Sequence, residues 1–210
     1  IFIYQKANNM IEVGKDILKK VYSTRPAEIR KYDFGLLLVI GGSEFYSGSP
    51  ALSSLAAFES GVDMVRIIAP KRAADIIASF SPILAAYPVA GDWVEKKHLA
   101  TLLSMAESAQ EVARGKAALV IGGGIGRSEE TQETILEFLR ANHLPAVIDA
   151  DAIYALAKDP GAIKGENSLV TPNTFEFFRL TGREIYQLPA EEKIAAVQEE
   201  AAKLKATILL

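Results

Sequence analysis

Cysteine is absent from the 210-residue chain, histidine occurs only twice, and no long hydrophobic run is present. The absence of cysteine excludes disulfides, a thiol nucleophile and a cysteine-based metal site, and it favours a cytoplasmic protein. Neither His98 nor His143 stands in a zinc-ligand pattern, so we expect no metal site of that kind. No apolar run approaches the ~20 residues that span a bilayer, and we therefore expect no contact with a membrane.

A surplus of basic residues is also missing. The formal net charge is −3, which favours neither nucleic acid nor an anionic membrane as a partner. Half of the residues are hydrophobic and 23% are charged, a composition typical of a globular domain with a real core. We expect residues 1–30 to form an N-terminal helix, over Asn8–Tyr22, and a connection, and residues 31–210 to form one α/β domain.

Short apolar runs alternate with helical patterns along this domain. Phe34–Ser43 has the pattern of a buried strand, and Pro50–Gly61 that of a helix for which Ser49 is a candidate cap. The same alternation continues to a last strand at Ala206–Leu210. It predicts a doubly wound, mostly parallel sheet with helices on both faces. We expect Trp93 and the phenylalanines of residues 175–178 to lie in its core.

Unusual residues follow four of the predicted strands. These strand ends read Gly-Gly-Ser at 41–43, Gly-Gly-Gly-Ile-Gly at 122–126, Asp-Ala-Asp at 149–151 and Thr-Pro-Asn at 171–173. In a doubly wound sheet, ligands bind at the carboxyl ends of the strands, so we expect the four corners to share one edge. The glycines match neither the dinucleotide fingerprint nor the P-loop.

Each corner also has an ordinary structural interpretation. The glycines of 122–126 could form a tight turn or let a ligand approach the backbone amides. Asp151 is a candidate helix cap, whereas Asp149 could hold Mg²⁺ or a buried amide. Asn173 and Glu176 have the spacing of a capping box.

In their order along the chain, these segments resemble the ADP/ATP-dependent NAD(P)H-hydrate dehydratases. The similarity runs from about Lys31 to the end and is carried by "VIGGSEFYSGSPALSSLAAFESGVDMVRI", "LVIGGGIGRSEET", "PAVIDADAIYALA" and "VTPNTFEFFRLTG". It implies a ribokinase-like fold and a repair reaction in which a nucleotide phosphorylates the hydrated nicotinamide ring. It further implies ADP or ATP and Mg²⁺ as cofactors, NADHX or NADPHX as substrate, and a homo-oligomer, since family members often form tetramers.

The resemblance places substrate contacts on particular residues. Ser49 stands where the family has a small residue, commonly alanine, and Gly126 closes the glycine loop. Asn173 stands where many members have the histidine of a His-Pro-Gly-Glu run, of which only Glu176 is kept. With the neighbouring corner residues, the predicted substrate site comprises Gly42, Ser43, Gly48, Ser49, Gly124, Gly126, Asp149, Asn173 and Glu176.

The family's catalytic aspartate lies in a Gly-Thr-Gly-Asp loop that the resemblance places beyond Leu210. We therefore expect residues 1–210 to be a fragment that is inactive alone, with one sheet face uncovered beside the last strand. Two other functions stay open: a kinase of the same superfamily acting on a vitamin-precursor alcohol, which the Thr-Pro-Asn run favours, and a non-catalytic nucleotide-binding module.

Overall fold

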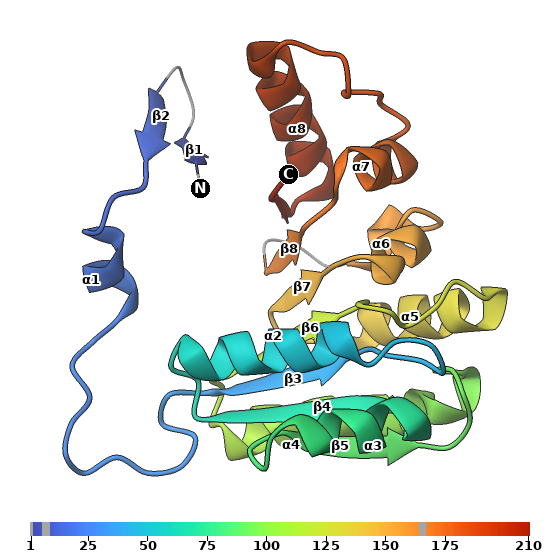
Figure 1. Cartoon of the computed structure of the whole chain (residues 1–210). Coiled ribbons are helices and arrows are strands. Elements are labelled where there is room, and N and C mark those ends of the chain that lie inside the picture. Colours follow the sequence, from blue (N-terminus) through green and yellow to red (C-terminus); the bar gives the residue numbers. More distant parts are fainter. Residues whose placement is uncertain (1, 6–8, 164–166) are drawn as a thin grey trace. The chain divides into compact units, whose positions relative to one another are not determined.

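The computed structural model describes residues 2–5, 9–163 and 167–210, which form two units, Ile1–Arg30 and Lys31–Leu210 (Figure 1). In the smaller unit, β1 (Phe2–Gln5) and β2 (Asn9–Glu12) pair antiparallel, and α1 spans Ile17–Val21. The helix predicted from residue 8 to residue 22 is therefore wrong over most of its length, and Asn8 itself lies outside the described residues. A glycine at position 14 weakens any helix that would cross it.

The larger unit is built on a seven-stranded sheet in which every pair is parallel. The strand order is β5-β4-β3-β6-β7-β8-β9, so the order reverses between β3 and β6. This confirms the predicted doubly wound α/β fold. The strands are β3 (Leu36–Ile40), β4 (Met64–Pro70), β5 (Ala85–Val89), β6 (Ala117–Ile121), β7 (Ala146–Ile148), β8 (Ser168–Val170) and β9 (Thr207–Ile208).

Helices cover both faces of the β3–β4 half of the sheet. Two helices, α2 and α3, contribute Ala51 and Ile77 to one cluster with Val39, while α4, α5 and α6 form the larger core with fully buried Phe138 on the other face. No helix within the described residues is long and apolar enough to cross a membrane. The helices are α2 (Gly48–Glu59), α3 (Lys71–Phe80), η1 (Lys96–His98), α4 (Leu99–Val112), α5 (Glu129–Ala141), α6 (Asp151–Leu156), η2 (Pro160–Ala162), α7 (Thr174–Thr181) and α8 (Ala190–Leu204).

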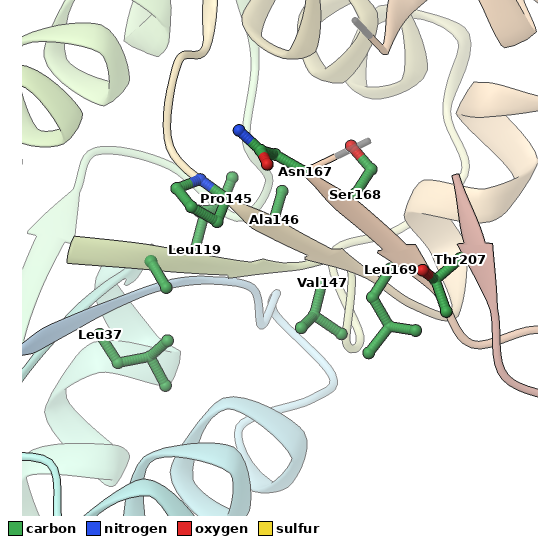
Figure 2. Close-up of a pocket in the computed structure, with 10 residues that line it drawn as sticks. Leu37, Leu119, Pro145, Ala146, Val147, Asn167, Ser168, Leu169 and Thr207 are labelled. Carbon is green, nitrogen blue, oxygen red and sulfur yellow. The ribbon is translucent and has the colours of Figure 1, made fainter. Parts of the chain in front are cut away.

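One face of the sheet is only half-buried at β6, β7 and β8. Ala118, Val147 and Leu169 on this face line a hollow of about 270 Å³, together with Thr207 of β9 (Figure 2). The hollow reaches Pro145 and Asn167, the residues that directly precede β7 and β8. It is therefore mostly aliphatic and lies toward the amino ends of these strands, away from the edge where parallel sheets bind ligands.

Two local predictions are wrong. Helix α2 begins at Gly48 with Ser47 at the cap position, so Ser49 lies inside the first turn and does not cap the helix. Of the phenylalanines in α7, only Phe177 is buried; Phe175 and Phe178 are 53% and 41% exposed. A single helix can bury only one stripe, and residues 175 and 178 lie on the other side of α7 from residue 177.

His98 is buried at the junction of η1 and α4, and its Nδ1 accepts a hydrogen bond from the Glu95 N–H at 3.0 Å. Burial of the ring and the charge of Lys97 lower the pKa of His98, and the carbonyl of Ala90 and the carboxylates of Glu95 and Glu130 offset only part of this. As the pH falls through about 6.5, the unfolded chain therefore takes up a proton on His98, whereas His98 of the folded chain stays neutral until a lower pH.

The stability that His98 contributes should be fully present above pH ~6.5 and should decline as the pH falls below that value, with a slope of at most about 1.4 kcal/mol per pH unit. Urea unfolding between pH 5 and pH 7.5 measures this slope. The His98→Gln variant should be less stable at neutral pH and should lack this part of the slope. An equal slope in both proteins would contradict the assignment.

Candidate functional site

The carboxyl ends of β3 and β6 meet at the point where the strand order reverses. The Gly42 N–H donates to the Gly123 carbonyl at 2.9 Å, and the Gly122 N–H donates to the Ile40 carbonyl at 3.1 Å. The first and second predicted corners are thus joined through their backbones. Doubly wound sheets bind ligands in the crevice at this switch point.

Close packing explains why the second corner is rich in glycine. A Cβ on Gly122 would collide with the Asp149 carbonyl and with Ala152, and one on Gly123 would collide with the Ser49 side chain. A Cβ on Gly124 would lie 2.6 Å from the Tyr46 Cβ, and one on Gly126 2.5 Å from the Trp93 ring. A Cβ at any of these four positions would therefore collide with another part of the protein, whether or not a ligand is bound.

A narrow cavity brings three of the corners together. Ser49, Gly123 and Asp149 line it, and its volume of about 10 Å³ is close to the minimum for one water molecule. The Asp149 carboxylate also accepts a hydrogen bond from the Thr171 hydroxyl at 2.8 Å, so the fourth corner is tied to the third. The four corners therefore lie along one edge of the sheet, as predicted.

Asp151 links the glycine loop to α6 instead of capping the helix. Helix α6 begins at Asp151 itself, and the preceding Ala150 has a positive φ of 48°. The Asp151 carboxylate accepts from the Gly126 N–H at 3.0 Å and from the Arg127 Nε at 2.5 Å. The cap predicted for Asp151 is therefore wrong, because the turn at Ala150 directs its carboxylate to a loop 25 residues earlier in the chain.

Side-chain caps form at the starts of α5 and α7, which follow the second and the fourth corner. The Ser128 hydroxyl accepts from the Thr131 N–H at 3.1 Å at the start of α5. Asn173 and Glu176 form the predicted capping box, in which the Asn173 N–H donates to the Glu176 carboxylate at 2.9 Å. The Asn173 side-chain oxygen is occupied by this cap, which leaves its side-chain amide as the group that faces solvent.

Aromatic side chains border the glycine loop. Phe45 and Tyr46 are 69% and 64% exposed, and the Phe45 ring lies 5.8 Å from that of Trp93. Trp93 is half-buried and lies against Gly126, so the core position predicted for it is wrong. Sequence reasoning missed this contact because Trp93 follows β5, an edge strand whose end carries no unusual motif.

The remaining predicted residues lie in the same region but differ in burial. Ser43 is fully buried, and among the described residues its hydroxyl has no hydrogen-bond partner, whereas Gly48 is exposed in the first turn of α2. In the described part of the chain, no three acidic or histidine side chains cluster as metal ligands do. The Asp149 carboxylate accepts from the Thr171 hydroxyl.

The fold and this edge define a ribokinase-like α/β protein. Its structure resembles that of a ribokinase-like superfamily protein from Enterococcus faecalis, with a TM-score of 0.76 and 25% identity over 94% of this chain and 64% of that one. A Bacillus subtilis ADP/ATP-dependent NAD(P)H-hydrate dehydratase, co-crystallized with ATP/Mg²⁺, has the same fold, with a TM-score of 0.70, 24% identity and coverage of 94% and 65%.

Residues 37–210 match the model of the NAD(P)H-hydrate dehydratase family, and the chain belongs to that family. It is 42% identical over 190 residues to the bifunctional NAD(P)H-hydrate repair enzyme Nnr of Pyrobaculum aerophilum, across 89% of this chain and 36% of that protein. It is 32% identical to the ATP-dependent (S)-NAD(P)H-hydrate dehydratase of Neurospora crassa, across 94% and 62%. The chain thus spans about a third to three fifths of these relatives.

Proposed function

We propose that the protein repairs hydrated nicotinamide cofactors, by ADP- or ATP-dependent dehydration of NADHX or NADPHX to NADH or NADPH. The observation that supports this most directly is the convergence of the four corners. Ser49, Gly123 and Asp149 line one cavity, and Thr171 is bonded to Asp149. Ligands bind at that edge of a doubly wound sheet, which supports it as the place for the dinucleotide.

The residues of this edge would hold and orient the dinucleotide. The Gly126 N–H donates to the Asp151 carboxylate, which holds the loop in place, and Ser49 and the amide of Gly124 would contact the ligand. A loop held in this way loses less conformational freedom when a ligand binds. The amino end of α5 at Ser128 presents a positive dipole to the same region. The side-chain amide of Asn173 is free to donate to the ligand, since its oxygen serves the cap.

A nucleotide would supply the phosphoryl group that converts the ring hydroxyl into a good leaving group, a reaction that depends on positioning and charge neutralisation. Mg²⁺ is usually held by the nucleotide phosphates together with one or two carboxylates. Asp149, whose carboxylate accepts from the Thr171 hydroxyl, stays a candidate for such a contact. We also infer that residues 1–210 alone are inactive. The Gly-Thr-Gly-Asp loop that the resemblance predicts for the catalytic aspartate does not occur in these residues.

The test is recovery of NADH. Protein expressed from the intact gene is supplied with hydrated NADH and either ADP or ATP with Mg²⁺, and absorbance at the NADH band is followed. We expect NADH to return with one or both nucleotides, and no return with residues 1–210 alone. The same preparation is offered a hydroxymethyl-pyrimidine and a thiazole alcohol. Phosphorylation of either alcohol without NADH recovery would replace the repair function by a vitamin-precursor kinase.

Two further expectations accompany this function. A cytosolic location fits the absence of cysteine, and fractionation of the native cell measures it. The homo-oligomer that the family resemblance implies stays a prediction, and light scattering of the intact protein gives its mass.

A further inference from the structure

Arg127, which follows the glycine loop directly, is held in place by two contacts. Its Nε donates to the Asp151 carboxylate at 2.5 Å, and its guanidinium carbon lies 3.7 Å from the centre of the Tyr154 ring. The side chain is nevertheless 52% exposed. Within the described part of the chain, no hydrogen-bond partner is recorded for its two terminal amino groups. The guanidinium is therefore held in one orientation through its Nε and its contact with Tyr154, and its terminal amino groups are available to a ligand.

The charges at this edge are predominantly negative. The four corner segments, residues 41–50, 122–128, 149–151 and 171–176, contain four carboxylates and a single cation, Arg127. The carboxylates are Glu44, Asp149, Asp151 and Glu176. A dinucleotide carries a pyrophosphate with two negative charges, which such an edge would repel unless a cation received it.

Two cations outside the four corner segments contact residues within them. Arg72 donates to the carbonyl of Glu44, and the guanidinium of Arg179 lies 5.1 Å from the centre of the Phe175 ring. Partial burial acts to lower the pKa of Arg127, but the bond to Asp151 and the nearby Glu176 raise it overall, so the group stays charged.

We infer that Arg127 receives the pyrophosphate of the dinucleotide substrate, an inference that rests on the proposed function. A guanidinium binds two phosphate oxygens through its paired N–H groups, and stacking on an aromatic ring fixes its plane. Tyr154 supplies that ring and Asp151 fixes the Nε edge, while the half-exposed side chain leaves the terminal amino groups for the phosphates. The neighbouring Gly126 places this cation beside the predicted substrate contacts.

The matched control lies at the other end of the same helix. Arg140, in the last turn of α5, is 48% exposed and donates to Asp159 at 2.6 Å, so Arg127→Gln and Arg140→Gln each remove one half-exposed arginine from one ion pair. A third variant, Arg127→Lys, keeps the charge and loses the planar pair of donors. All three are made in the protein expressed from the intact gene, and thermal unfolding is recorded for each.

For Arg127→Gln we expect the KM for hydrated NADH to rise about ten- to thirtyfold, with kcat changed less than about threefold. Arg127→Lys should fall between this variant and the wild type, and Arg140→Gln should stay within about twofold of the wild type. Inorganic pyrophosphate should compete with substrate in the wild type and lose that competition in Arg127→Gln, which a merely structural role would not cause. A KM within twofold of the wild type in Arg127→Gln would overturn the inference.

If the wild type recovers no NADH, the proposed function fails, and calorimetric titration with ADP-ribose then decides the role of Arg127. Binding by the wild type that weakens at least tenfold in Arg127→Gln, and not in Arg140→Gln, supports a pyrophosphate site. Equal binding by all variants, or no binding by the wild type, overturns it.

Discussion

Replacement of Gly122 by alanine is expected to destabilise the larger unit by about 3 kcal/mol or more, the sum of backbone strain and overpacking. The residue has a φ of 125°, which alanine rarely adopts. Its Cβ would collide with the Asp149 carbonyl and the Ala152 side chain, which lie at the start of α6 and cannot move separately. The junction of β6 with α6 would therefore have to open.

Urea unfolding of the wild type and of the Gly122→Ala protein measures the difference in the free energy of unfolding. Gly48→Ala is the control, because a Cβ at Gly48 meets no atom within 4 Å and the residue lies in the first turn of α2. We expect this control to be neutral or slightly stabilising, by up to about 1 kcal/mol. A Gly122→Ala protein within about 1 kcal/mol of the wild type would show that the loop can shift, and that close packing is not what requires glycine there.

The fold could be predicted because the alternation of short apolar runs and helical patterns is a local property of the sequence. β3, β4 and β6 are short runs rich in Val, Ile and Leu that end at glycine or proline, a pattern typical of strands in a parallel sheet. The N-terminal unit could not be predicted this way. Its apolar residues fit a short strand as well as a helix, and nothing in the local pattern distinguishes the two.

The site could be predicted as a location more reliably than as a set of contacts. That four corners share an edge follows from the parallel sheet, and the capping box of Asn173 follows from a three-residue spacing. The link from Asp151 to Gly126 and Arg127 depends on the turn at Ala150, whose positive φ is unusual for alanine and leaves no mark in the sequence.

Gly126→Ala should reduce activity far more than stability, in contrast to the change at Gly122. The residue has a φ of 98°, and a Cβ there would lie 2.5 Å from the Trp93 ring. Trp93 is half-buried and packs against exposed Phe45, so the ring can move at moderate cost. We expect about 1–2 kcal/mol of destabilisation, and a loss of about a hundredfold in kcat/KM for hydrated NADH because the loop and its amide would be displaced.

The double variant Gly126→Ala with Trp93→Ala separates the two causes. Removing the ring relieves the collision but leaves the strained φ, so activity that returns to within about tenfold of the Trp93→Ala protein would assign the loss to the ring contact. Activity that stays a hundredfold lower would assign the loss to the strained backbone and to the hydrogen bond that the Gly126 N–H donates to the Asp151 carboxylate. A single Gly126→Ala protein as active as the wild type would remove Gly126 from the substrate site, since a contact that tolerates such a displacement does not position the ligand.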